Sequence, residues 1–289
     1  MANSIALSKV YTNLLDEVYQ QSALTAVLES DASLARQGAN ANEIVIPKLS
    51  MDGLADYSRN GGYVNGDVTL NWETVQFNYE RGRMFSVDNM DNEETQNIAF
   101  GRLAGEFIRT KVVPELDAFR FATYAATTGA GTATGALATG VDVIAALRKA
   151  TSDMDEAEVP MEDRHLFITP TNLGLVEDMD TTKSKEVLAR FASITKVPQT
   201  RFYSVIELLD GKSSGEEKGG YKKADLGVEL NFEIIHKPAV LQFTKHAVPK
   251  VISPELNQDA DAWKYGYRNY GLCDTYENKA AGIYVHKKA

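Results

Sequence analysis

The stretch NYERGRMFSVDNMDNEET, residues 78 to 95, joins a strand-like run to a cluster of carboxylates. Successive side chains of a strand point to opposite faces, so Arg81 and Arg83 lie on the same face. That face also carries Phe77, Tyr79, Phe85 and Val87. Arginine and aromatic residues are enriched together in the buried centres of protein interfaces. The pattern favours a surface that meets another protein; the alternative is that both guanidinium groups reach solvent at the end of the strand.

The residues before this stretch predict a long β-hairpin over residues 43–88. The run EIVIPKL predicts a strand, and the Gly- and Asn-rich run SMDGLADYSRNGGYVNGD predicts a long turn. The returning strand carries Val68, Leu70 and Trp72 on one face. Its apolar residues change face near Thr74, which predicts a β-bulge or a local twist. Because an isolated hairpin is only marginally stable in water, we expect this one to need another surface to lie on.

The strongest helical pattern covers residues 92–126. Asp91 and Glu94 have the spacing of a capping box, and Glu93 adds negative charge to the first turn. Pro114 lacks an amide hydrogen, so we expect it to bend the helix. At 1.5 Å per residue such a helix would be about 50 Å long, which predicts a spine for the molecule.

The second half of the chain alternates between helical and strand patterns. The small residues 126–140 predict a linker, and VDVIAALRKATSDM predicts a helix capped by Thr139 and Asp142. RHLFI predicts a strand, followed by a helix with Thr169 as its N-cap. This alternation predicts a separate α/β unit. The aromatic-rich runs that follow predict strands, and residues 4–30 predict one or two short amphipathic helices.

Composition limits the classes of function. The 289 residues, 44% of them hydrophobic and 24% charged, predict a globular chain of one large or two ordinary domains. The net charge of −10 is opposite to that of a protein that grips DNA phosphates. Cys273 is the only cysteine, so no internal disulfide is expected. With neither a secretory signal pattern nor a long apolar run, we expect a cytoplasmic protein without a membrane partner.

Motifs for catalysis are weak. GKSSG places Ser213 in the pattern G-x-S-x-G, but no buried strand precedes it and no helix follows. A cytosolic α/β hydrolase that uses Ser213 is therefore only a remote alternative. The four histidines lie far apart along the chain, and helix capping or ion pairing accounts for the carboxylates Asp88, Asp91, Glu93 and Glu94. We expect no enzyme activity, no cofactor and no metal site.

The order of these parts resembles the major capsid protein of tailed bacteriophages, with its Hong Kong 97-like fold. The resemblance covers nearly the whole chain and is strongest in FNYERGRMFSVDNMDNEET, VVPELDAF, HKPAVLQFTKHAVPKVISPE and AWKYGYRNYG. It implies an α+β fold whose parts are an N-terminal arm (1–42), an extended β-hairpin loop (43–88), a peripheral domain with a spine helix (89–138), an axial α/β domain (139–245), and return strands with a C-terminal strand (246–289).

The resemblance also implies partners. The extended loop would lie across a neighbouring subunit, and hexamers and pentamers would tile an icosahedral shell around double-stranded DNA, bound without sequence specificity. The residues expected at contacts between subunits are Trp72, Phe77, Tyr79, Arg81, Arg83, Asp88, Glu93 and Glu94. We expect Arg81 and Arg83 to pair with carboxylates across subunits.

Two features limit what the resemblance implies. The chain starts directly at the arm, so any scaffolding protein is expected to be separate, alongside a portal and decoration proteins. The tip DYSRNGGY offers no lysine for an isopeptide bond, so no covalent cross-link is expected. The expected location is the virion, after assembly in the cytoplasm of the bacterial host. The alternative of the same fold is an encapsulin-type compartment, which encloses a cargo enzyme.

Overall fold

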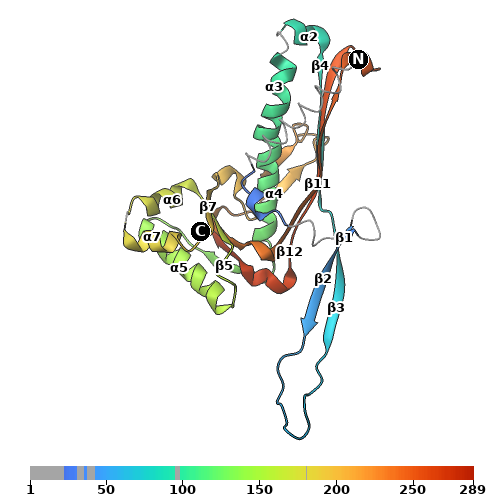
Figure 1. Ribbon diagram of the computed structural model, residues 1–289. Helices are drawn as coiled ribbons and strands as arrows, with labels where there is room; N and C mark the ends of the chain where they lie inside the picture. The colour runs from blue at the N-terminus through green and yellow to red at the C-terminus, as the bar shows by residue number, and fades with distance from the viewer. Residues whose placement is uncertain (1–22, 31–35, 38–42, 95–97, 180) are drawn as a thin grey trace.

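The computed structural model describes residues 23–30, 36–37, 43–94, 98–179 and 181–289 (Figure 1). Within these residues the chain forms four sheets. One has five strands, two have three strands each, and one has two. The mixed α+β class expected from the sequence is confirmed. The part of residues 4–30 that lies in the described region contains only the 3-10 turn η1 (Ala26–Leu28), and the rest of that predicted helix lies outside it.

The projecting hairpin, residues 43–76, consists of β2 (Glu43–Met51) and β3 (Val68–Gln76). The two-residue strand β1 (Arg36–Gln37) pairs with its base. The register runs unbroken from Glu43 opposite Gln76 to Met51 opposite Val68, so the predicted bulge at Thr74 is wrong. The chain instead changes sheets after Gln76, because the next strand pairs elsewhere. The hairpin therefore ends near residue 76, twelve residues before the predicted boundary at residue 88.

The central sheet has the order β11-β12-β4. Its strands are β4 (Tyr79–Asp88), β11 (Val240–Ile252) and β12 (Ala262–Thr275). Figure 1 shows α3 and α4 running along one side of this sheet. These helices and the π-helical turn between them form a continuous helical rod. Its residues Ala104, Ile108 and Val112 pack with Tyr265 and Tyr267 of β12. Odd-numbered side chains of β4 turn toward the rod, as the alternation predicts.

The spine is not one helix from residue 92. The helix α2 (Asn89–Glu94) comes first, and Asp88 Oδ1 accepts a hydrogen bond from Met90 N at 2.9 Å, which is N-cap geometry. The predicted cap at Asp91 is thus wrong by three residues. After α3 (Ile98–Phe107), the π-helical turn η3 (Ile108–Val112) leads into α4 (Val113–Ala125). Pro114 lies in the first turn of α4, directly after this π turn. The sequence predicted a bend at this proline, and the structure has a π turn just before it.

The α/β unit is built on a five-stranded sheet of order β5-β13-β10-β6-β7. Its strands are β5 (Gly131–Thr134), β6 (Arg164–Ile168), β7 (Ser193–Lys196), β10 (Leu230–His236) and β13 (Ile283–Lys287). The helices are α5 (Gly140–Glu156), α6 (Pro170–Glu177) and α7 (Thr182–Leu188). These three helices cover one face of the sheet, and the end of α4 covers the other.

Two boundaries of the predicted α/β unit need correction. The presumed linker 126–140 contributes β5, which pairs in parallel with β13. The C-terminal strand β13 thus belongs to this sheet. The chain leaves the sheet after β10, and β11, from Val240, already belongs to the central sheet. The predicted caps are confirmed: Thr139 and Asp142 form a capping box on α5, and the Thr169 side chain accepts from Asn172 N at the start of α6.

A small separate hairpin completes the fold. It consists of β8 (Ile206–Leu209) and β9 (Gly220–Lys223), which pair only with each other. The remaining connections are the 3-10 turns η4 (Gln199–Arg201), η5 (Lys237–Ala239), η6 (Pro254–Leu256) and η7 (Glu277–Gly282). No helix in the described ranges is long and apolar enough to cross a membrane.

Candidate assembly surface: the projecting hairpin and its base

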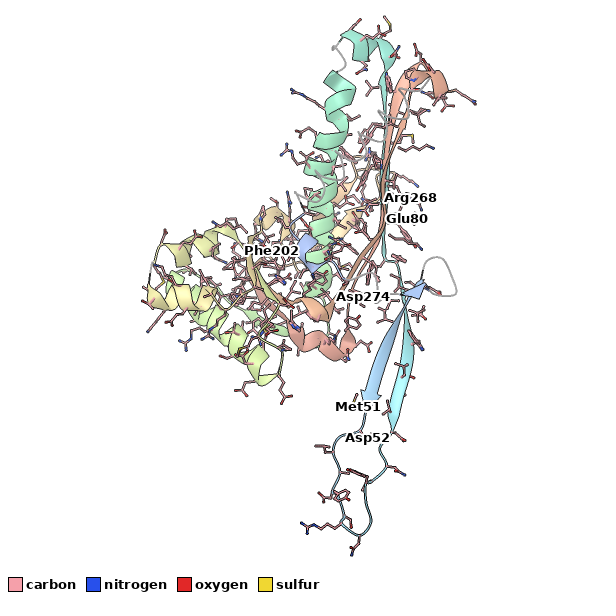
Figure 2. The ribbon with its side chains drawn as sticks, in the orientation of Figure 1. Met51, Asp52, Glu80, Phe202, Arg268 and Asp274 are labelled. Carbon is pink, nitrogen blue, oxygen red and sulfur yellow. The ribbon has the colours of Figure 1, made fainter. Side chains whose placement is uncertain are left out.

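The outer half of the projecting hairpin exposes its large apolar side chains to solvent. Leu54 and Tyr63 are fully or nearly fully exposed, and Trp72 retains 46% of its surface. The other exposed members are Met51, Tyr57, Val64, Val68 and Leu70. Figure 2 shows Met51 and Asp52 far from the body of the molecule, where the chain enters the loop at the hairpin's end. Nine residues of strand span about 30 Å, so the hairpin reaches well beyond its own body.

The tip of the hairpin has a defined shape of its own. Asp67 N donates to Asp52 Oδ2 at 2.9 Å, which closes the base of the tip. Ser58 and Gly62 exchange backbone hydrogen bonds, and Gly62 has a φ of 80°, a value that favours glycine. The rings of Tyr57 and Tyr63 lie 4.9 Å apart. The tip therefore presents two tyrosines on a closed turn.

The base of the hairpin is anchored to the central sheet by apolar packing. Ile44 and Ile46 are buried against Leu241, Phe243 and Leu272, on the face of the sheet away from α4. This arrangement holds the near end of the hairpin while leaving the outer half uncovered.

Polar and aromatic contacts reinforce the base. The Phe77 ring lies 4.9 Å from that of Tyr270, with the Lys245 amine 4.9 Å above it. Asn78 bonds both backbone groups of Cys273, through Nδ2 to the carbonyl at 2.6 Å and through Oδ1 to the amide at 3.1 Å. Phe77 is thus used within its own chain, a role different from the one expected.

Tyr79 and Arg81 lie beneath the spine, where they contact Glu115 of α4. Arg81 Nε lies 2.7 Å from Glu115 Oε1, and the Tyr79 hydroxyl donates to the same oxygen at 3.3 Å. Burial, and secondarily the charge of Glu115, raise the pKa of Tyr79 well above its usual value. Arg81 thus pairs with a carboxylate of its own chain, at a position that no sequence pattern marked, and the expected pair across subunits stays a prediction.

Arg83 also has partners in its own chain. Its Nη1 donates to the carbonyl of Lys218 and its Nη2 to that of Glu217, both at 2.9 Å. Within the subunit, its partners are therefore two backbone carbonyls of the turn between β8 and β9, and the expected carboxylate on another subunit stays a prediction. The alternative in which the guanidinium only reaches solvent is also wrong, although the side chain is exposed.

Asp88, Glu93 and Glu94 lie at the opposite end of the molecule from the hairpin tip (Figure 1). All three are exposed. The structure does not bring them together with Trp72 or the two arginines. They form a second exposed region, at the start of the spine.

This chain is similar to known proteins in its structure and not in its sequence. Neither a family model nor a curated protein matches the sequence. Solved structures do match it. The mature capsid of bacteriophage PhiM1 has a TM-score of 0.58 at 10% identity, over 89% of this chain and 84% of that one. The capsid of cyanophage P-SCSP1u has a TM-score of 0.53 at 13% identity, over 88% and 85%. A virus-like particle from Pyrococcus furiosus has a TM-score of 0.59 at 11% identity, over 97% and 99%.

The chain has the Hong Kong 97-like capsid fold. Identities this low establish the fold and leave the function to be argued from the molecule itself.

The local structure around Ser213 does not fit the serine nucleophile motif. Its hydroxyl donates to Asp210 Oδ2 at 2.5 Å within the exposed turn between β8 and β9. A nucleophile elbow needs a helix directly after the serine, whereas here the turn leads into β9. Among the described residues, no three His, Cys, Asp or Glu side chains form a group that could hold a metal ion.

Sequence reasoning missed two features of this capsid fold. Glu115 lies 34 positions from Arg81, and only the packing of α4 on β4 brings them together. Tyr57, Tyr63 and Leu54 lie in a run that was interpreted only as a turn. Their signal was present, because large apolar residues are unusual in a solvated loop.

Proposed function

We propose that this protein is the major capsid protein of a tailed phage, a structural subunit without enzyme activity. In this proposal the subunits assemble as hexamers and pentamers into an icosahedral shell that encloses double-stranded DNA. The capsid fold supports this function at the level of the whole chain. The observation that carries it is the projecting hairpin, whose outer half exposes large apolar side chains to solvent.

The physical argument is one of unburied apolar surface. Large contiguous apolar surface exposed on a soluble protein marks a site of interaction, and aromatic side chains are over-represented among the residues that carry binding energy. The firmly packed base holds the hairpin in one direction, which reduces the entropy that docking would cost. A second copy of the chain is the proposed cover. Trp72 is retained from the residues expected at the contact, and Leu70, Tyr57 and Tyr63 are added.

The same proposal assigns roles to the other parts. The α/β unit corresponds to the axial domain around the fivefold and sixfold axes, and Asp88, Glu93 and Glu94 are proposed to contact a further subunit at the far end. A portal, a separate scaffolding protein and decoration proteins are the proposed partners in the virion, which would assemble in the host cytoplasm.

A second candidate is a compartment of the encapsulin type, which shares the fold and encloses a cargo protein. The match to the virus-like particle over nearly the full length of both chains favours it. Particles isolated from their native source and treated with nuclease separate the two. Protected double-stranded DNA supports the phage shell, and one stoichiometric cargo protein supports the compartment. A protein that stays monomeric when concentrated excludes both.

Replacing Leu70 and Trp72 together by serine tests the surface that carries the proposal. Both are about half exposed on β3, so the double change should lower the free energy of unfolding of the subunit by only about 1–2 kcal/mol and leave it folded. Losing two contact residues of the kind that costs about 2 kcal/mol each should lower particle yield more than tenfold. Sedimentation velocity and electron microscopy measure the yield. The control is Thr69→Ser on the same exposed strand, and normal particle yield from the double variant would remove the hairpin from the assembly surface.

A further inference from the structure

The hairpin of β8 and β9 is held to the rest of the molecule in an unusual way. None of its residues belongs to the hydrophobic clusters of the described chain. Its side chains are exposed or half-buried throughout. The bond from Ala224 N to the Val205 carbonyl closes the open end of the hairpin, and the Tyr221 hydroxyl donates to the Thr200 carbonyl and ties the hairpin to η4. Packing therefore does not fix the turn at its other end.

Two arginines of β4 hold that far end through its backbone carbonyls. Arg81 Nη2 donates to Leu209 at 2.7 Å and to Gly220 at 3.3 Å, where the two strands meet the turn. Arg83 donates to the carbonyls of Glu217 and Lys218 within the turn. Hydrogen bonds from a charged donor are stronger than those between neutral groups. Four such bonds from one strand fix the backbone of the turn through the two guanidinium groups.

The turn is shaped to receive Arg83. Gly211 and Gly219 have φ values of 72° and 62°, in the region that favours glycine. A Cβ on Gly219 would lie 2.9 Å from Arg83 Nη1, and one on Gly211 would lie 3.5 Å away. A side chain at Gly219 would therefore push the guanidinium out of the turn.

A groove of about 1260 Å³ separates this turn from the spine. The turn forms one wall, α3 and α4 form the other, and Arg81 and Arg83 cross between them. Arg81 also holds Glu115 of α4, so one side chain connects the central sheet, the spine and the small hairpin. The open groove leaves room for the turn to move once the arginines release it.

We propose that Arg81 and Arg83 form a latch that fixes the small hairpin relative to the central sheet and the spine, and that the orientation of this hairpin at subunit contacts sets the curvature of the assembled shell. This inference rests on the proposed function, because curvature has meaning only in an assembly. In a shell of identical copies, a change in the angle between two parts of the subunit is repeated at every contact. The latch is the polar connection best placed to set that angle, since the groove contributes no packing there.

The test uses the variants Arg83→Gln and Gly219→Ala, which weaken the latch from opposite sides and leave the Arg81–Glu115 pair intact. The control is Lys222→Gln on β9, whose charge pairs with Glu207 of the same hairpin. Hydrogen–deuterium exchange of peptides that cover residues 206–223 is measured on the subunit. Both latch variants should exchange there at least tenfold faster than wild type and control, with thermal unfolding midpoints within a few degrees of each other.

Particle diameters from electron microscopy give the second readout. The latch variants should form particles with a broadened or shifted diameter distribution, whereas the control keeps the wild-type distribution. Unchanged exchange at residues 206–223 overturns the latch, and faster exchange with uniform wild-type particles overturns its control of curvature. If the wild-type protein forms no particles at all, the proposed function fails together with the curvature claim, while the exchange result still decides whether the latch exists.

Discussion

Glu233 lies in the middle of the five-stranded sheet and is fully buried. Within the described chain neither of its carboxylate oxygens has a hydrogen-bond partner. Burial raises the pKa of this carboxyl well above its usual value, and the charge of Lys287 opposes the shift only in part. The folded protein therefore holds Glu233 as a neutral acid under conditions in which the unfolded chain ionises it.

This proton gives a testable pH dependence. Above the ordinary carboxyl pKa and below the raised one, the folded state binds one proton more than the unfolded chain, so stability falls as pH rises. The slope for one proton is at most about 1.4 kcal/mol per pH unit. Glu233→Gln removes the ionisable group, so its free energy of unfolding should fall less steeply with pH than that of wild type. Urea denaturation of the subunit from pH 5 to 8 measures both slopes, and parallel curves would contradict the assignment.

Arg81 and Arg83 illustrate what single residues reveal in a sequence. Alternation along the strand correctly predicted that Tyr79 and Arg81 turn toward a buried face, because that property is local. It did not predict their partners, because Glu115 and the carbonyls of Leu209 and Lys218 come from segments that only the folded chain brings near. The sequence therefore indicated a contact surface but not the partners within the same chain, and the predicted contacts with another subunit stay a prediction.

Among the elements, β5 depends most directly on a small residue. Gly131 pairs with Tyr284 of β13, and a Cβ at this glycine would overlap the buried Tyr284 ring. Gly131→Ala should lower the free energy of unfolding by about 1–3 kcal/mol, the usual cost of overpacking. The matched control is Gly135→Ala, whose Cβ would meet only the His286 ring, at 3.8 Å. Chemical denaturation measures the free energy of unfolding of both variants. Equal values would show that β5 can shift away from the Tyr284 ring without cost.

The same strand shows why some elements escape prediction. Helix α5 and strand β6 were predicted correctly because their apolar periodicity and caps are written in consecutive residues. Gly131–Thr134 has small residues and no such pattern, and it becomes a strand only because β13, far along the chain, offers an edge. The end of the projecting hairpin was misplaced for a similar reason, since β4 continues its alternation but pairs with β12.

The whole molecule is elongated, and a part of the chain projects at each end. Figure 1 shows the projecting hairpin leaving the body in one direction and α2 standing at the other end of the spine. The face of the central sheet away from the spine carries the ion pair of Glu80 and Arg268 (Figure 2). The order of parts along the sequence predicted this plan, and the capsid fold of solved structures matches it. What the sequence left open was which surfaces the chain covers by itself.

The central claim is that residues 43–76 find their cover on another copy of the chain. A cryo-electron microscopy reconstruction of the particles tests it most directly, at a resolution that traces the hairpin. We expect Leu70, Trp72 and the two tip tyrosines to be in contact with a neighbouring subunit. A reconstruction in which these side chains point into solvent, or in which the hairpin lies against its own subunit, would contradict it.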